Sequence, residues 1–316
     1  MKSFTLIKTN YNNHVSMDLY HEFEANIINK TALWEVCNGV NIWQAFIIRQ
    51  ILKFLKPFTI PIYKNKNYVI LGHQKEKFFP YFHYKAKSKT LWMYDAWQPL
   101  YTEIEQTIQT YHINLLLTAS KQSADYFEAL GIKNFKAQWV PEAVDVSKYH
   151  FVDYQQRTID VLQLGRKWNL YHNKIKPIEK TLTYKYEKQA GTIIFKTRED
   201  FLKGLANAKI SICVPSSITH PEITGSVSTI TNRFFQSMAS KCLILGKLPD
   251  DMLHLFDYNP IIEIDDNNAE NQIYDLLKNY DNYIPLIEKN YEIVKKYHNW
   301  NERIKTIENA VNSITN

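Results

Sequence analysis

The sequence predicts an α/β protein made of two Rossmann-like, doubly wound domains in series. Short apolar runs alternate with amphipathic helical patterns along most of the chain, which is typical of parallel sheets covered by helices on both faces. The length of 316 residues favours two domains over one. No short-period repeat and no low-complexity tract breaks this pattern.

The second half of the chain carries the clearer pattern. Apolar runs predict strands at residues 158–165, 191–197, 209–216, 242–246 and 260–265. Helical spacing predicts helices at residues 198–208, 232–240, 250–256 and 268–280. We therefore expect a second domain at residues 151–285, followed by a long C-terminal helix, residues 286–316, that packs across both domains.

The first half, residues 1–150, shows the same alternation less regularly and is expected to form the other domain. Strands are predicted at residues 3–9, 68–74, 89–97 and 113–120, and within 135–145. A helix at residues 121–131 ends at Gly131, as is usual for a glycine just beyond a helix C-terminus.

A further helical pattern at residues 43–58 has two interpretations. One helical face holds the large apolar residues Trp43, Ile47, Ile51, Phe54, Leu55 and Phe58, while Arg49, Lys53 and Lys56 lie elsewhere. A basic amphipathic helix of this kind can rest on a membrane surface. A core helix of the first domain, stopped by Pro57, is the favoured interpretation.

Composition limits the classes of function. The net charge of +6 is mild and the basic residues are dispersed, so nucleic-acid binding is not expected. The cysteines Cys37, Cys213 and Cys242 are far apart and show no metal-type spacing. The N-terminus lacks a signal-peptide pattern, and no run of about 18 apolar residues occurs. We expect a cytoplasmic protein, with peripheral contact at the inner face of the membrane as an open alternative.

Several loops of the second domain carry cations where a ligand is expected. In open parallel sheets, ligands bind beyond the carboxyl ends of the strands, at loops that lead into helix N-termini. Arg233 lies in a first helical turn, where its charge opposes the helix dipole, so a ligand phosphate is favoured as its partner over a protein carboxylate. Thr231 is predicted to cap the same helix. Lys196 and Arg198 are each more typical of solvated charges. Neither a Walker motif nor G-x-G-x-x-G occurs.

The segments "IDVLQLGR", "DFLKGLANAKISICVPSS", "TITNRFFQSMASKCLILG" and "YHNWNER" together resemble the nucleotide-sugar half of GT-B glycosyltransferases. The resemblance is nearest to the group 1 (family 4-type) enzymes and their branch that includes spore-maturation-protein-like glycosyltransferases. The T-x-R-x-F-E-type motif of that branch matches at Thr231, Arg233 and Phe235. Gln236 replaces the family glutamate and Lys241 the turn glycine. The resemblance covers most of residues 68–316 and implies two domains that face a cleft.

The resemblance implies transfer of a hexosyl group from a nucleoside-diphosphate sugar to a glycan, glycolipid or protein acceptor, as in polysaccharide biosynthesis. In such enzymes fixed cations and helix N-termini, in place of a metal, stabilise the departing diphosphate. No cofactor and no metal are expected, and no convincing D-x-D motif is present. The expected donor-binding residues are Arg166, Lys196, Ser228, Thr229, Thr231, Arg233 and Gln236. Gln236 can hydrogen-bond a ribose because an amide both donates and accepts.

Two residues of the first domain, Asp95 and His73, are the catalytic candidates because each lies near a predicted strand end. His14 is a further candidate of the same kind. Retention of configuration is favoured by the resemblance, and Asp95 would then orient the acceptor; in an inverting enzyme it would be the general base.

Two other functions remain as alternatives. A GT-B-fold nucleotide-sugar-binding module with weak or no turnover is suggested by Gln236 and Lys241, where the family motif is broken. A sugar-nucleotide epimerase would need a cluster of acids and histidines that the sequence does not assemble.

Overall fold

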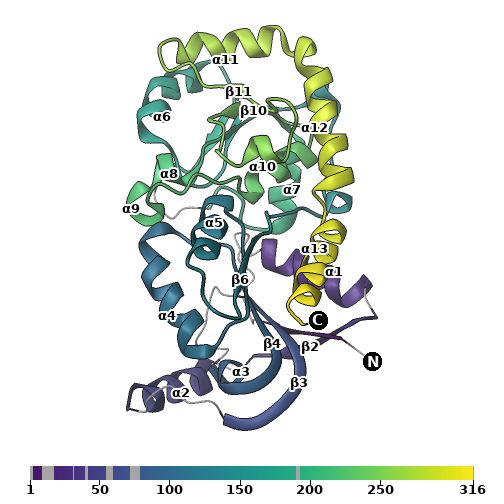
Figure 1. The fold of residues 1–316 in the computed structure, drawn as a ribbon. Coiled ribbons are helices and arrows are strands. Elements are labelled where there is room, and N and C mark those ends of the chain that lie inside the picture. Colours follow the sequence, from purple (N-terminus) through teal and green to yellow (C-terminus); the bar gives the residue numbers. More distant parts are fainter. Residues whose placement is uncertain are drawn as a thin grey trace. The chain divides into compact units, whose positions relative to one another are not determined.

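The computed structural model describes residues 3–8, 18–30, 32–39, 42–54, 60–71, 79–189 and 193–315. The chain divides into two compact units (Figure 1). One is built mainly from residues 20–141 with the chain end from residue 301, and the other mainly from residues 142–300. Each unit has its own parallel sheet, which confirms the predicted fold class of two α/β units.

The first unit is built around a six-stranded sheet in the order β2-β1-β3-β4-β5-β6. Its strands are β1 (Phe4–Lys8), β2 (Trp34–Asn38), β3 (Ile60–Leu71), β4 (Tyr84–Met93), β5 (Leu115–Thr118) and β6 (Lys136–Trp139). Every residue of β5 is buried, as is expected of a strand covered on both faces.

The helices of the first unit follow the strands along the chain. They are α1 (Asp18–Lys30), α2 (Ile42–Phe54), α3 (Phe79–His83), α4 (Tyr101–Tyr111) and α5 (Lys121–Ala129). The Ser120 hydroxyl caps α5 by accepting a hydrogen bond from the Ser123 N–H at 3.2 Å. Gly131 lies just beyond the end of α5 with φ +61°, as the sequence predicts.

The second unit has a five-stranded sheet in the order β11-β10-β9-β7-β8, again parallel. Its strands are β7 (Ile159–Gln163), β8 (Tyr184–Tyr186), β9 (Ala208–Cys213), β10 (Leu243–Gly246) and β11 (Ile262–Glu263). Its helices are α6 (Asn169–Ile175), α7 (Arg198–Ala206), α8 (Ser216–Thr219), α9 (Pro221–Thr224), α10 (Asn232–Ala239), α11 (Ala269–Lys278) and α12 (Ile284–Tyr297). Two apolar clusters form its core, and Phe234, Phe235 and Met238 fix α10 in one of them.

A strand was predicted at residues 191–197. The described part of this range, residues 193–197, forms a loop, so the prediction is wrong there. The edge strand that pairs with β7 is β8. There the Tyr184 hydroxyl donates to the Gln163 side chain at 2.5 Å. Phe195 supplies much of the apolar character that predicted the strand. Its ring is buried against Gly204, where an added Cβ would lie 2.1 Å from the ring.

The C-terminal pattern forms two helices, α12 and α13 (Trp300–Ser313), where one long helix was predicted. Between them the chain forms a parallel β-bridge from Asn299 to Val144, and the Val144 N–H donates to the His298 carbonyl at 3.2 Å. α13 packs in the first unit, where its Glu308 accepts a hydrogen bond from the Trp34 indole at 2.7 Å.

The favoured interpretation of the pattern at residues 43–58, a core helix, is wrong for the side chains that the structure describes. Trp43, Ile47 and Ile51 lie on α2, and all three are exposed. The pattern predicted the helix correctly, because core helices and interfacial helices share the same apolar spacing. Residues 55–58 lie outside the described residues.

Gly246, at the end of β10, is required by a close approach between strands. It pairs with Cys213 of β9, and a Cβ at Gly246 would lie 1.9 Å from the Cys213 carbonyl oxygen. That oxygen also accepts the Lys247 N–H at 3.3 Å, so it cannot move away without loss of a hydrogen bond.

Replacement of Gly246 by alanine should therefore lower the free energy of unfolding of the second unit by about 3 kcal/mol, because backbone atoms must separate. Gly131→Ala is the control, since its added methyl group meets no atom within 4 Å; it should cost only about 1 kcal/mol for the left-handed backbone. Urea unfolding of both variants measures the difference. Equal losses would show that the strand contact does not limit the site.

Candidate functional site

The candidate site lies at the carboxyl edge of the second sheet, where β7 and β9 end and α10 begins. Arg233, in the first turn of α10, connects these elements: its Nη1 donates a hydrogen bond to the Leu164 carbonyl oxygen at 2.7 Å. Leu164 directly follows β7. The arginine that the sequence selected by its position against the helix dipole thus lies beside the loop that follows the first strand of the unit.

Gly165 lets the guanidinium lie against the backbone. It has φ +67°, in the left-handed region that side chains disfavour. A Cβ at this position would lie 3.3 Å from Arg233 Nη1. A side chain at residue 165 would therefore strain the turn and shift the guanidinium by a few tenths of an ångström.

Among the described residues, no carboxylate is hydrogen-bonded to the Arg233 guanidinium. Burial lowers the pKa of Arg233, and the nearby Arg166 lowers it too, while Cys213 and Glu142 raise it. An arginine nonetheless stays charged at neutral pH. Arg166 is exposed and makes no hydrogen bond or ion pair with any other described residue. Two guanidinium groups therefore share a region that favours an anion.

His220, between α8 and α9, interacts electrostatically with both Arg166 and Arg233, and it was not among the site residues predicted from the sequence. Burial lowers the pKa of His220, with further lowering by Arg166 and Arg233 and a partial offset by Glu222. The ring is therefore neutral at pH 7, and its Nδ1 is buried without a hydrogen-bond partner in the described part of the chain.

Three more buried polar atoms lack partners among the described residues, one on α8 next to His220 in the chain and two at the start of α10. They are Thr219 Oγ1, Thr231 Oγ1 and Asn232 Oδ1. Each buried polar atom that makes no hydrogen bond destabilises a fold by about 1–3 kcal/mol, so such atoms are rare in proteins. Thr231 and Asn232 directly precede Arg233 at the start of α10, where a polar, anionic ligand would complete the hydrogen bonds.

Thr231 occupies the N-cap position of α10, as predicted, with an extended backbone at φ −112° and ψ 164°. Its side chain makes no capping hydrogen bond, however. The helix N-terminus, with its partial positive charge, is thereby left without a side-chain cap.

Two of the predicted donor-binding hydroxyls are engaged in shaping the loop before α10. Thr229 donates to Asp251 Oδ2 at 2.6 Å, and the Ile230 N–H donates to Oδ1 of the same carboxylate at 2.8 Å. Ser228 Oγ accepts the Asp250 N–H at 3.2 Å. Asp251 is buried and was missed, because the sequence marks it only as one of two adjacent aspartates.

Gln236 is buried on α10 and already has a protein partner. Its Nε2 donates to the Tyr149 hydroxyl at 3.0 Å. The amide remains able to accept a further hydrogen bond through its oxygen. Gln236 and Tyr149 thus form a buried polar pair that involves α10.

The remaining cations of the predicted loops differ in how they are held. Lys167 donates to the Glu187 carbonyl at 2.6 Å and Lys247 to the Ile264 carbonyl at 3.0 Å, so both are occupied. Lys196 is exposed just before the N-cap of α7, and it makes no hydrogen bond or ion pair with a described residue. No contact joins Lys196 to the Arg233 cluster.

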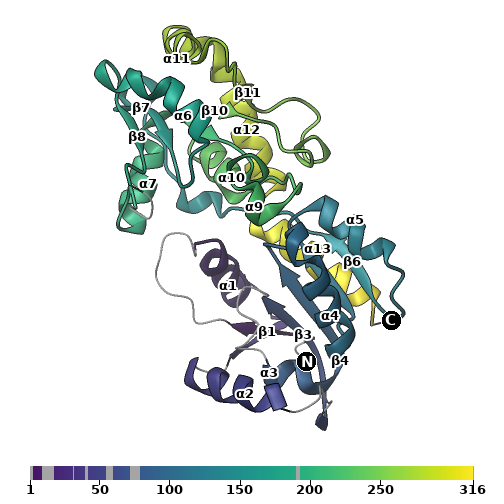
Figure 2. The same ribbon diagram turned by 90° about the vertical axis from the view of Figure 1, so that its left-hand side faces the viewer.

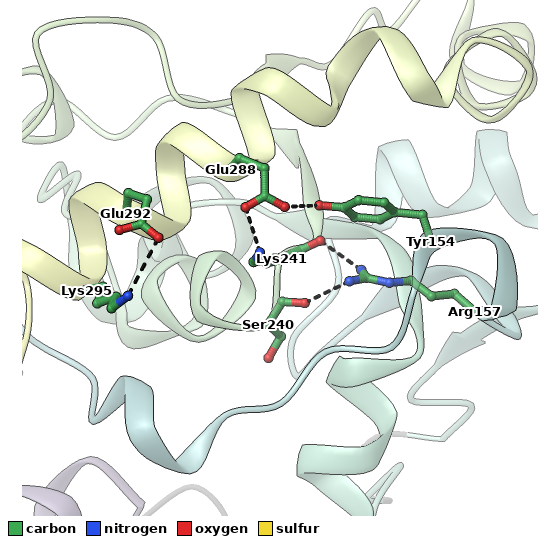
Figure 3. Close-up of polar contacts among 7 residues, drawn as sticks. All are labelled: Tyr154, Arg157, Ser240, Lys241, Glu288, Glu292 and Lys295. Carbon is green, nitrogen blue, oxygen red and sulfur yellow. Dashed lines mark hydrogen bonds and ion pairs between the residues drawn. The ribbon is translucent and has the colours of Figure 1, made fainter.

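Lys241 has a left-handed backbone with φ +53°. Its ammonium group pairs with Glu288 of α12 at 2.6 Å (Figure 3) and lies 4.1 Å from the Phe151 ring centre. Its carbonyl accepts Arg157 Nη1 at 2.8 Å. These contacts offset a left-handed strain of about 1–2 kcal/mol, so the turn after α10 is preserved.

Of the catalytic candidates in the first half of the chain, the structure describes only Asp95. Asp95 is exposed in the turn after β4, directly after the buried Tyr94. His73 and His14 lie outside the described residues. Asp265 accepts the Asn267 N–H at 3.0 Å in the turn before α11. Among the described residues, no three His, Cys, Asp or Glu side chains gather as a metal site.

The fold is similar to that of solved glycosyltransferases. Anabaena HepE, solved with UDP-glucose, superposes with a TM-score of 0.60 at 8% identity over 98% of this chain and 99% of HepE. An α-glucosyltransferase solved with UDP and DNA gives 0.58 at 12% identity over 98% and 100% of the two chains. Sucrose-phosphate synthase from Thermosynechococcus elongatus gives 0.60 at 8% identity over 99% of each. No family model and no curated protein sequence matches this chain.

Replacement of Arg233 by alanine should weaken binding of a nucleoside diphosphate at least about tenfold, because charged hydrogen bonds of about 1.5–3 kcal/mol are lost. Isothermal titration with UDP measures the change. Lys203→Ala, which removes an exposed cation from α7, is the control and should leave the affinity unchanged. Unchanged affinity in a folded Arg233→Ala protein would remove Arg233 from the site.

The affinity for UDP-glucose should fall as pH rises from the free-state pKa of His220, which is depressed below 6.5, through its higher pKa in the complex, because a bound diphosphate would stabilise the imidazolium. Binding then takes up a proton, and this gain is lost once the pH exceeds the pKa of His220 in the complex. Titrations in buffers of different protonation enthalpy measure the uptake. His220→Gln should abolish it, and persistence of the uptake would exclude His220.

Proposed function

We propose that the protein is a glycosyltransferase that moves a hexosyl group from a nucleoside-diphosphate sugar to a glycan, glycolipid or protein acceptor. The observation that carries the proposal is the cluster of Arg233, Arg166 and His220 at the start of α10, with its unpartnered buried polar atoms. The cluster lies at the carboxyl edge of a parallel sheet, where such folds bind nucleotides.

The proposed chemistry is stabilisation of the departing diphosphate. As the bond from the sugar to the phosphate breaks, negative charge develops on the phosphate oxygens, and prearranged cations lower the energy of that state. Arg233 is fixed by its bond to the Leu164 carbonyl, so its charge needs little reorganisation. The uncapped N-terminus of α10 adds a partial positive charge. We propose that these groups stabilise the diphosphate without a metal ion or a cofactor.

Gln236 and Tyr149 are proposed to bind the ribose of the donor. The Gln236 oxygen can accept from a ribose hydroxyl while its nitrogen stays bonded to Tyr149. Thr231 is proposed to reach the phosphates through its unpartnered hydroxyl. Ser228 and Thr229 instead support the loop, and Lys196 stays a candidate by its position alone.

The acceptor side of the proposal rests on Asp95. In a retaining reaction, which the family resemblance favours, no protein base is needed and Asp95 would orient the acceptor hydroxyl. His73 is kept as a second candidate there. Polysaccharide biosynthesis in the cytoplasm, at the inner face of the membrane, is the setting that we propose.

A nucleotide-sugar-binding module with little turnover is the second candidate function. The observation that favours it is the neutral Gln236, whose amide nitrogen is taken by Tyr149. A glutamate at this position would hold two ribose hydroxyls with charge-assisted hydrogen bonds, which are about twice as strong as neutral ones.

A thermal-shift panel of UDP-, GDP-, CMP- and dTDP-sugars tests both candidates, because a ligand that binds only the folded state raises the unfolding temperature. We expect a shift with at least one nucleoside-diphosphate sugar and release of its nucleotide when a suitable acceptor is added. Binding without hydrolysis or transfer across a broad acceptor panel favours the module. No shift with any nucleotide contradicts both.

A further inference from the structure

The helix α2 presents a continuous apolar face that no described part of the chain covers. Trp43 is 75% exposed, and Phe46, Ile47 and Ile51 are each more than half exposed. Their spacing of three and four residues places them along one side of the helix. Four exposed large apolar side chains on one 13-residue helix form a patch of the kind that marks a docking surface.

The chain around this helix is strongly basic. Residues 41–90 contain ten lysines and arginines and one acidic residue, Glu76, a net charge of +9. The rest of the chain has a net charge of −3, so the overall value of +6 hides a marked asymmetry. The helix α2 itself contains Arg49 and Lys53 and no acidic residue.

Three lysines of the strands β3 and β4 are solvent-accessible, whereas Lys89 of β4 is buried and Lys66 of β3 pairs with Glu35. The helix α3 contacts α2 and leads directly into β4, which pairs with β3 (Figures 1 and 2). Lys64 of β3 and Lys85 and Lys87 of β4 are exposed. Lysines therefore accompany the apolar face within the same unit.

An apolar face surrounded by positive charge favours an anionic membrane over a second copy of this chain as the partner of α2. A second copy of this chain would bring two regions of +9 together, which like-charge repulsion disfavours. An anionic bilayer satisfies both features: the apolar side chains enter the boundary between headgroups and acyl chains, and the lysines meet lipid phosphates. No helix among the described residues is long and apolar enough to cross a bilayer, so α2 would lie in the plane of the surface.

We propose that α2, with the exposed lysines of β3 and β4, docks the protein on an anionic phospholipid membrane. Trp43 and Ile47 insert at the interface, since an indole is favoured at that depth. The lysines add an attraction that salt weakens. This inference does not depend on the proposed sugar transfer, because the surface and the anion site use different residues in different units.

Co-sedimentation of the full chain with vesicles tests the proposal. The protein should bind phosphatidylcholine vesicles that contain phosphatidylglycerol, and bind pure phosphatidylcholine at least about tenfold more weakly. Ile51→Asp should weaken binding to the anionic vesicles at least about tenfold, because it places a carboxylate in the apolar face. Ile28→Asp is the matched control: Ile28 is an isoleucine on α1 of the same unit, and it and Ile51 are each 52% exposed.

Three results would overturn the proposal. The first is that the unaltered protein does not bind the anionic vesicles. The second is that Ile51→Asp and Ile28→Asp weaken binding equally. The third is that the protein forms a dimer in vesicle-free buffer and that Ile51→Asp dissociates this dimer. Thermal shift with UDP-sugars in the same variants separates this inference from the proposed function, because Ile51→Asp should leave that shift unchanged.

Discussion

The hydrogen bond from Arg233 to the Leu164 carbonyl is the interaction on which the arrangement of the second unit's binding edge depends. It connects the end of β7 with the start of α10 and passes close to Gly165, where an added Cβ would lie 3.3 Å from Arg233 Nη1. The guanidinium is partly buried, and Arg166 lowers its pKa while Cys213 and Glu142 raise it. An anionic ligand would add to the stabilisation that the Leu164 carbonyl and Glu142 provide.

Polar groups of the loop before α10 are hydrogen-bonded within the protein, whereas some of those at the start of α10 are not. Asp251 holds Thr229 and Ile230, and Gly246 lets β10 approach β9, so the strand and loop ends are fixed by contacts that need no ligand. Thr231 and Asn232, at the start of the helix, keep polar atoms that the described residues do not satisfy. A rigid frame around unsatisfied groups is the arrangement expected of a preorganised site, in which ligand binding needs little change of the protein.

The sequence predicted the parallel α/β units and the position of α10 because strand and helix periodicities are local. It found Arg233 because an arginine in a first helical turn conflicts with the helix dipole. It missed β8, whose three residues alternate Tyr-Lys-Tyr and are too short for a pattern, and it missed His220, which lies outside any periodic element. Burial of Asp251 and exposure of α2 depend on tertiary packing, which periodicity does not specify. For α2 the same spacing suits a core and a membrane surface.

The proposed function requires that the start of α10 binds the diphosphate of a nucleotide. A crystal structure of the protein with UDP would show where the nucleotide lies. We expect phosphate oxygens within hydrogen-bonding distance of Arg233 and of the backbone N–H groups at the start of α10, with His220 or Thr231 as a further partner. A nucleotide bound elsewhere, with the phosphates distant from Arg233 and the buried polar atoms still unpartnered, would contradict it.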